Sequence, residues 1–551
     1  MNRFVPLALA ACLSAAIPLG AAPSIAKSGV KNGASYVDPG FPNGSIAQGS
    51  IFDVFGSGLG PAQIQYASSF PLPTTLSGTS VSVTVSGTTV QCYMLFTLAS
   101  QVAAILPSTT PVGTGTMVVS YNGATSATTP VTVVAHSLGL FTVNQQGNGL
   151  GVIQDGGGKP NAASWAFAPN QQVVFWGTGL GPITGSDAAQ PVQGNLPGIT
   201  VTANIGGKAA QVAYAGRSLN AGADQINVII PAGVTGCYVP AYITVAAGGV
   251  VTSSNMVSIA IAASGTTCTD SAAPSGLISG QGYKFGSIDL SRTSMSLSFG
   301  GMSINQTTDS GSGTFQAFNA SYLTSGMTPF YDQQVGSCIV YQLTPQTGGT
   351  PILPIGLDAG PVINVNGPNG AKQLLQDNKS TPGFYDTQSP LGQQTTFPGL
   401  PSSPLYLDPG TYTLDNGAGG KDVGPFKLTL VVPPTFNWTN QSSITTVDRT
   451  QPLTVTWTGG DPNSLVWVSG SSTSSSNANG FFVCYGKDSD LSLTVPPAIL
   501  ALLPPSAVQG GSATGLLSVM TNVTVNGSAP GLDMLTATDE SGAAKVGITY
   551  K

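Results

Sequence analysis

The stretch Val54–Pro61, with the sequence VFGSGLGP, recurs as FWGTGLGP at Phe175–Pro182, an offset of 121 residues. A second stretch, Gln101–Pro107, recurs as Gln225–Pro231 with an offset of 124 residues. Because both pairs keep their order and nearly the same spacing, we interpret them as a duplicated domain. Two copies are too few for a solenoid, which needs at least three stacked repeats.

Short runs of alternating apolar and polar residues surround the repeated stretches. Val81–Val85 alternates in the first copy and Val201–Ile205 in the second, and turns containing Gly separate such runs. Alternation over four to eight residues, with no helical pattern between the runs, is typical of a β-sandwich. We therefore predict an all-β fold: tandem immunoglobulin-like β-sandwiches followed by one or two further β-sandwich-like domains.

The repeat and the changes in composition also predict the domain boundaries. The chain has 551 residues, enough for about four domains. The expected parts are a signal peptide at 1–26, the first sandwich at 30–135, the second at 136–262, a linker at 263–280, a β-rich domain at 281–432 and a C-terminal sandwich-like domain at 433–551.

An ordered set of motifs marks the first half of the chain. They are Asn32–Tyr36, Ile46–Ile51, Phe55–Pro61, Leu72–Leu76, Leu140–Thr142, Trp176–Pro182 and Asp224–Val228. In this order they resemble the uncharacterised Solibacter-type C-terminal tandem domain of exported acidobacterial proteins, which is similar to IPT/TIG-type immunoglobulin-like modules. The resemblance covers about 30–262 and implies a fold, but no activity and no catalytic residues. The module usually ends a longer protein, whereas here 263–551 follow it.

Charge is scarce throughout the chain. Charged residues make up 7% and the net charge is −6, whereas about 25% is usual. No run of Lys or Arg is present, and nucleic-acid binding needs a basic face. The same lack argues against binding to anionic membranes. A surface of hydroxyls and amides suits contact with sugars, polymers or other copies of the chain.

The N-terminus has the pattern of an export signal. Arg3 precedes the apolar stretch Phe4–Leu19, and Ser24–Ala26 fits a cleavage site, with an earlier cut near Ala21 as an alternative. Cys12 ends a lipobox-like sequence, but the apolar stretch before it is short, so we do not expect a lipid anchor there. No later stretch has the roughly 20 apolar residues that span a bilayer. We expect a secreted or cell-surface protein.

Five cysteines follow the predicted signal, and export permits disulfides. Cys237 and Cys268 flank one predicted strand pair and its tail, so we expect them to be joined. Cys338 with Cys484 is the next expected pair, which leaves Cys92 as a small buried residue. The chain has one histidine and no CxxC motif, so the spacing does not indicate zinc.

The sequence offers little for catalysis. His136 is the only histidine, and no Gly-x-Ser-x-Gly elbow accompanies it. Glu540 is the only glutamate, although a pair of aspartates could in principle serve a glycoside hydrolase. The Gly56–Gly60 loop is followed by Pro61 and not by the helix that a phosphate site needs. We expect no catalytic residues, no cofactor and no enzyme activity.

Two groups of loop residues offer oxygen ligands for calcium. Asp415–Gly417 with Asp422 is one group, and Asp488 with Asp490 is the other. Neither group has EF-hand spacing, and such residues commonly form turns. We therefore expect no metal site.

One tryptophan is a candidate for ligand contact. Trp438 flanks the predicted domain junction and could expose its ring to stack on a sugar, whereas Trp176 and Trp457 lie in predicted strands and are expected in the core. Our leading hypothesis is a non-catalytic protein acting by adhesion or by presenting binding surfaces to an unknown surface, glycan or protein ligand. The alternative is a secreted carbohydrate-binding or carbohydrate-processing protein.

Overall fold

The structure is a computed structural model that describes residues 22–268, 282–299, 302–318, 331–343, 354–377, 383–397, 399 and 401–551. Most of the predicted signal peptide, including Cys12, and most of the predicted linker lie outside these residues. In the described part, no helix is long and apolar enough to cross a membrane.

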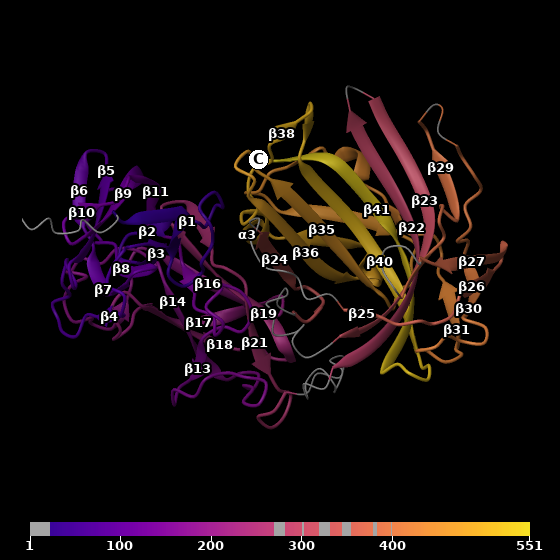
Figure 1. Ribbon diagram of the computed structural model, residues 1–551, viewed down its shortest axis with the longest axis horizontal. Helices are drawn as coiled ribbons and strands as arrows, with labels where there is room; N and C mark the ends of the chain where they lie inside the picture. The colour runs from indigo at the N-terminus through magenta and orange to yellow at the C-terminus, as the bar shows by residue number, and fades with distance from the viewer. Residues whose placement is uncertain are drawn as a thin grey trace, which may run out of the picture.

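The first sandwich consists of two antiparallel-rich sheets, seen at the indigo end of Figure 1. One has the strand order β1-β3-β8-β7-β4 and the other the order β2-β11-β9-β5-β6, with β10 beside β9. The strands are β1 (Ser24–Asn32), β2 (Ile46–Ala47), β3 (Ile51–Ser57), β4 (Gln65–Tyr66), β5 (Thr79–Val85), β6 (Thr88–Gln91), β7 (Tyr93–Leu98), β8 (Gln101–Ile105), β9 (Gly113–Tyr121), β10 (Ala124–Thr125) and β11 (Thr129–Val134).

The second sandwich repeats this arrangement. Its strands are β12 (Gly139–Leu140), β13 (Ile153–Asp155), β14 (Gln172–Thr178), β15 (Gly194–Asn195), β16 (Thr200–Ile205), β17 (Lys208–Arg217), β18 (Asp224–Ile229), β19 (Gly236–Ala247), β20 (Val250–Ser253) and β21 (Val257–Ile261). The order β12-β14-β18-β17-β15 matches that of the first sheet of the first sandwich. The duplication therefore extends from the sequence to the topology, and the predicted all-β class of tandem immunoglobulin-like sandwiches is confirmed.

Alternation along the strands builds both cores. In β5, Val81, Val83 and Val85 are fully buried while the residues between them are partly exposed. Successive side chains of a strand point to opposite faces, so one face packs inward. In the second copy the long strand β17 belongs to both sheets, whereas in the first copy Cys92 separates β6 from β7.

The C-terminal half is dominated by one large sheet with the order β24-β36-β35-β40-β41-β22-β23-β28-β27-β26-β30-β31. A three-stranded sheet, β32-β34-β37, and the short helix α3 lie beside it. The elements are β22 (Tyr283–Phe299), β23 (Met302–Phe318), β24 (Cys338–Leu343), β25 (Ile355–Gly356), β26 (Val362–Gly367), β27 (Gly370–Gln376), β28 (Phe384–Asp386), β29 (Gly392–Thr395), β30 (Gly410–Asp415), β31 (Lys427–Val432), β32 (Asn437–Trp438), β33 (Thr446–Val447), β34 (Leu453–Thr458), β35 (Leu465–Thr473), β36 (Asn479–Lys487), β37 (Ser492–Val495), α3 (Pro497–Leu500), β38 (Val508–Gln509), β39 (Ser512–Ala513), β40 (Gly515–Gly527) and β41 (Met534–Tyr550).

This sheet crosses the expected division at 432–433. Strand β24 pairs with β36, and β22 runs parallel to β41, so the ranges 281–432 and 433–551 share one sheet. The long strands β40 and β41 contribute to two hydrophobic cores, one shared with β22, β23 and β26–β31 and the other with β32-β34-β37. The boundary divides the two cores but not the sheet.

The second sandwich packs against the C-terminal half. Tyr242 and Met256 belong to the same buried cluster as Trp457. Ser253 donates a hydrogen bond to the carbonyl oxygen of Ala498 at 2.8 Å. Figure 1 accordingly shows the first sandwich at one end of the molecule and the large sheet at the other.

Candidate binding surface

The repeated motif places one aromatic residue on the outside of each sandwich. In β14, Phe175 is buried in the core, so its neighbour Trp176 points to the opposite face and is partly exposed. In β3, Phe55 has the equivalent place and is also partly exposed. We call these faces, formed by β3-β8-β7-β4 and by β13-β14-β18-β17-β15, the outer faces. The expectation that Trp176 belongs to the core is wrong, because strand alternation allows only one of the two rings inside.

The outer face of the second sandwich is rich in amides. Its amide side chains come from five strands and the residue before β15, and they are Gln154, Gln172, Gln193, Asn195, Gln211, Gln225 and Asn227. Two cross-strand rows run over it. One contains Gln154, Val174, Asn227 and Tyr214, and the other contains Trp176, Gln225, Gly216 and Asn195. None of these residues carries a charge.

Hydrogen bonds connect these side chains. Gln193 donates to Gln225 at 3.1 Å, and Gln225 donates to Asn227 at 2.9 Å. The indole N–H of Trp176 donates to Gln154 at 3.0 Å. These bonds fix the direction of the amides and of the indole ring. Each primary amide has two N–H groups and two acceptor sites, so the chain of bonds does not use all of them.

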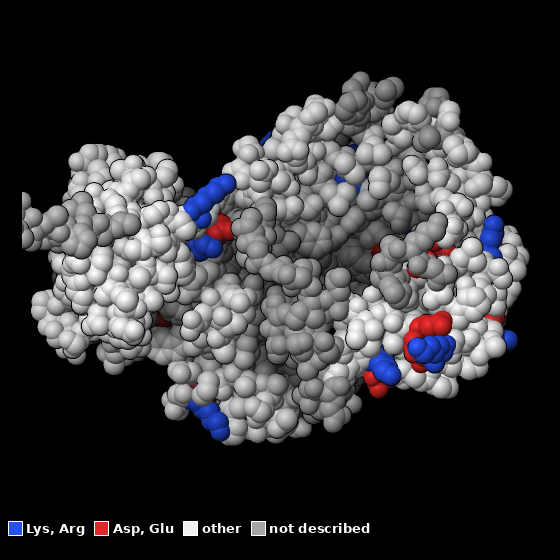
Figure 2. Space-filling model, in the orientation of Figure 1, with Lys and Arg blue, Asp and Glu red and all other residues white. Residues whose placement is uncertain are grey.

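The outer face of the first sandwich is mostly apolar, although Gln101 pairs with Phe55 there as Gln225 pairs with Trp176 in the second. Its matching row contains Asp53, Ala103, Phe96 and Tyr66. The ring centroids of Tyr66 and Phe96 lie 5.9 Å apart, and Tyr66 is 65% exposed. Asp53 is the only Asp, Glu, Lys or Arg between Pro39 and Gln154. Figure 2 shows the lobe of the first sandwich almost free of blue and red.

Asp53 is a buried carboxyl group within this apolar face. Burial raises the pKa of Asp53 to about 6, while hydrogen bonds from Gln101 and Tyr36 partly oppose the shift. The same environment raises the pKa of the Tyr36 hydroxyl. Val174 occupies the equivalent position of the second sandwich, so the two copies differ in chemistry at one strand position.

The second sandwich covers part of the first outer face. Leu72 donates a backbone hydrogen bond to the carbonyl of Ala188, and both lie in a buried cluster with Ile105. Asp187 accepts hydrogen bonds from the backbone N–H of Ser108 at 2.6 Å and from its hydroxyl at 2.9 Å. These contacts come from the loop that follows the repeated glycine motif.

A buried ion pair completes this junction. Arg217 pairs with Asp224, and their side chains are 8% and 0% exposed. The Arg217 guanidinium also donates to the carbonyls of Gly49 and Gly181, at 3.0 and 2.7 Å. Because this arginine bonds residues of both sandwiches, it fixes their relative position.

The glycine motifs and His136 have structural roles at this junction. Gly58 and Gly179 have φ values of 63° and 107°, which favour glycine, and each motif turns between strands. His136 Nδ1 lies 2.6 Å from the carbonyl oxygen of Leu180 in the second motif. Turn geometry therefore accounts for the glycines, and packing at the junction accounts for His136.

Trp438 does not form the exposed ring that the sequence suggested. It is 7% exposed, pairs with Trp457 across β32 and β34, and donates through its indole N–H to Asn440. The pairing was hidden in the sequence, because β32 has only two residues. The three-stranded sheet turns this ring toward the C-terminal core.

The structure joins Cys237 to Cys268 and Cys338 to Cys484, the two pairs that the sequence favoured. The first disulfide ties β19 to the segment after β21. The second links β24 to β36 within the large sheet, where the two cysteines are direct partners. Cys92 is buried and unpaired.

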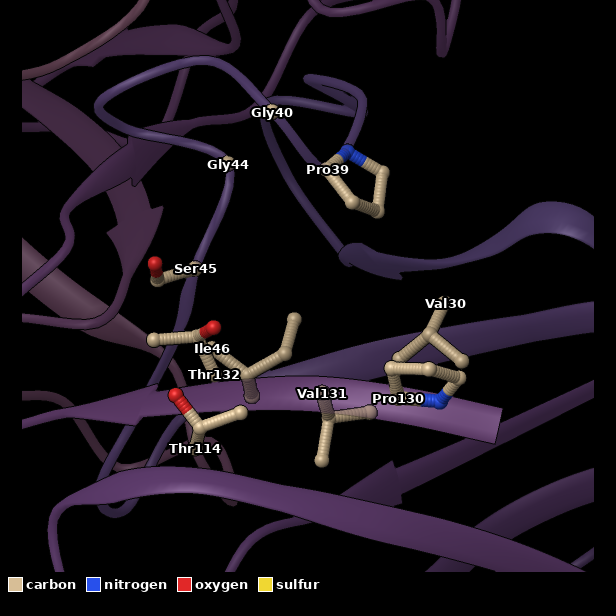
Figure 3. Close-up of a pocket in the computed structure, with 10 residues that line it drawn as sticks. All are labelled: Val30, Pro39, Gly40, Gly44, Ser45, Ile46, Thr114, Pro130, Val131 and Thr132. Atoms are coloured by element: carbon tan, nitrogen blue, oxygen red, sulfur yellow. The ribbon is translucent and has the colours of Figure 1, made fainter. Parts of the chain in front are cut away.

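A small cavity lies in the first sandwich (Figure 3), with a volume of about 160 Å³. It opens between the loop at Pro39–Gly44 and strands β9 and β11. Its lining is Val30, Pro39, Gly40, Gly44, Ser45, Ile46, Thr114, Pro130, Val131 and Thr132, with no charged side chain. Typical small-molecule sites have about 300–1,000 Å³ and a few convergent polar groups, so this cavity is a weaker candidate than the outer faces.

In the first group of loop carboxylates considered for calcium, Asp415 and Asp422 accept hydrogen bonds from nearby loops and strands. Asp415 accepts from the N–H of Gly417 and from Asn364, and Asp422 accepts from the N–H of Asp358. Over the ranges that the structure describes, no three His, Cys, Asp or Glu side chains are grouped to hold a metal ion.

One pair of carboxyl groups emerged only from the strand pairing. Asp289 on β22 and Glu540 on the parallel β41 are two register positions apart. Burial raises the pKa of both, and the charge of Asp289 raises that of Glu540 further. Asp289 is held by the Ser287 hydroxyl, at 3.0 and 2.9 Å from its two oxygens.

Comparisons with known proteins leave the chain without a family. No family model matches it, and no curated protein does. A solved structure of titin Ig tandem domains is 9% identical and covers 40% of this chain and 91% of its own, with a TM-score of 0.13. Domains 4–9 of surface layer protein SbsC are 12% identical and cover 94% of this chain and 81% of their own, also with a TM-score of 0.13. Scores this low carry no argument, so the immunoglobulin-like assignment depends on the strand order itself.

Proposed function

We propose that the chain is a non-catalytic protein of the cell exterior that presents binding surfaces on rigidly joined immunoglobulin-like sandwiches. The buried junction around Arg217 carries this proposal, because a presenting scaffold must hold its surfaces in a fixed relation. The two disulfides are consistent with an oxidising compartment. We propose secretion without a lipid anchor at Cys12, and kinship with the Solibacter-type exported proteins, on the sequence motifs alone.

The partner would be a surface, glycan or protein and not a nucleic acid. A charge-poor surface gains little from ionic attraction, so its binding should resist salt. We therefore expect fluorescently labelled full-length protein to be retained on intact bacterial cells or extracellular polymers after a wash in 1 M salt, a concentration with a Debye length of about 3 Å. Loss of all retention in that wash would overturn the proposal, as would turnover of a glycan substrate by the purified chain.

A further inference from the structure

We propose that the outer face of the second sandwich binds a neutral polysaccharide, with Trp176 as the stacking ring and Gln225 and Asn227 as hydrogen-bonding groups. This inference rests on the proposed function and names its ligand class and its residues.

The first step concerns the ring. Trp176 lies on a strand whose core position is already filled by Phe175, so its partial exposure does not serve the core. The indole N–H is held by Gln154 at 3.0 Å, which restricts the rotation of the ring. A fixed aromatic ring offers apolar area to the C–H face of a sugar at a small cost in side-chain entropy.

The second step concerns the amides. Gln225 is the direct cross-strand neighbour of Trp176, and the next residue in the row is Gly216. Strands lie about 4.8 Å apart, so a hydroxyl of a sugar on the indole comes within reach of the Gln225 amide. Gly216 has no side chain, and a Cβ there would meet the carbonyl oxygen of Gly194. Gln225 therefore lies next to the ring, and no other side chain of this row stands between Gln225 and Asn195.

The third step concerns charge. The residues of both rows and the further amides of this face are all uncharged. Such a face attracts neither an anionic nor a cationic polymer, while amides satisfy hydroxyl groups as both donors and acceptors. A neutral, hydroxyl-rich chain fits this surface better than an acidic polysaccharide or a charged protein.

Native gel electrophoresis of the full-length protein tests the proposal, with gels that contain xylan, galactomannan, mixed-linkage β-glucan or hydroxyethylcellulose, and alginate as the acidic control. We expect at least one neutral polymer to retard the protein and alginate not to do so. Trp176→Ala should weaken the interaction about 30-fold, as for an aromatic hot spot. Gln225→Ala should weaken it about tenfold, and Trp176→Phe should retain most of it.

Phe55→Ala is the matched control, because Phe55 has the same place in the first sandwich. It should migrate like the unchanged protein. Circular dichroism and thermal unfolding must show that the variants are folded. The proposal is overturned if no neutral polymer retards the protein, or if Trp176→Ala and Phe55→Ala behave alike. Light scattering that shows dimers abolished by Trp176→Ala would assign the face to a second copy. Retention on cells without any glycan binding would leave the proposed function standing and remove only this inference.

Discussion

The two sandwiches share one strand order but present different outer faces. At equivalent positions the first copy has Ile51, Asp53 and Phe55, and the second has Gln172, Val174 and Trp176. The first face is mostly apolar and partly covered by the second sandwich, whereas the second face is rich in amides. Duplication kept the inward positions apolar and left the outward residues to change in polarity. An outer face that a neighbouring domain covers needs apolar contacts. An outer face that is open to solvent can acquire residues that bind a ligand.

The largest difference is the buried ion pair of the second copy, since Ala99 and Ser100 stand at the equivalent positions in the first. Asp224→Ala should lower the stability of the second sandwich by about 3–5 kcal/mol, because it leaves Arg217 buried without its partner. Hydrogen exchange of β14, β17 and β18 amides measures this loss. Lys31→Ala is the control: it removes the more exposed pair with Asp38 and should cost less than about 1 kcal/mol. Equal effects of the two variants would contradict the role of the junction.

Much of this comparison could be predicted from the sequence, and its limits have physical causes. The repeat predicted the tandem sandwiches, and alternation in Val81–Val85 predicted an inward face. Alternation does not show which outward face a neighbouring domain covers. The amide-rich surface could therefore not be predicted from the sequence. Trp176 was misplaced because the sequence alone did not show which of the adjacent rings, Phe175 or Trp176, points inward.

The C-terminal half was less predictable because its pairing is long-range. The contact of β24 with β36 joins residues that are 146 positions apart at the disulfide. No local pattern indicates such a partner, so the sheet shared by both C-terminal cores could not be anticipated. The two cysteine pairs could be predicted, because few pairings of the cysteines were plausible.

A disulfide is the second difference, because the first sandwich contains only the unpaired Cys92. Replacing Cys237 and Cys268 together by Ser should cost about 3 kcal/mol, since the bond closes a loop with a sequence separation of 31. Urea unfolding followed by limited proteolysis should show the second sandwich opening first. Cys92→Ala should cost about 1 kcal/mol. If the order of opening did not change, the disulfide would not distinguish the two copies.

Asp53 supplies a pH-dependent difference, since Val174 replaces it in the second copy. Its folded pKa of about 6 lies above the ordinary value near 4, so the folded state holds the proton more tightly. The contribution of Asp53 to stability is therefore greatest below pH 4 and is lost as the pH rises through 6. The stability of Asp53→Val relative to the unchanged protein should increase by about 2 kcal/mol between pH 4 and pH 8. Thermal unfolding at both pH values measures it. Asp53→Asn should show the same trend, and a pH-independent difference for both variants would refute it.

Tyr66 should give the smallest effect. Its ring is largely exposed and contacts Phe96, so a double-mutant cycle with Tyr66→Ala and Phe96→Ala should yield a coupling of about 0.5–1 kcal/mol. Phe397→Ala, at another exposed phenylalanine in the C-terminal half, is the control for removing a surface ring. Tyr66→Ala should also leave polysaccharide retardation unchanged, because we assign binding to the second sandwich. Loss of retardation in Tyr66→Ala would instead assign polysaccharide binding to the outer face of the first sandwich. The comparison would then be reversed, because the less polar face would bind the ligand and the amides of the second face would contribute only to solubility.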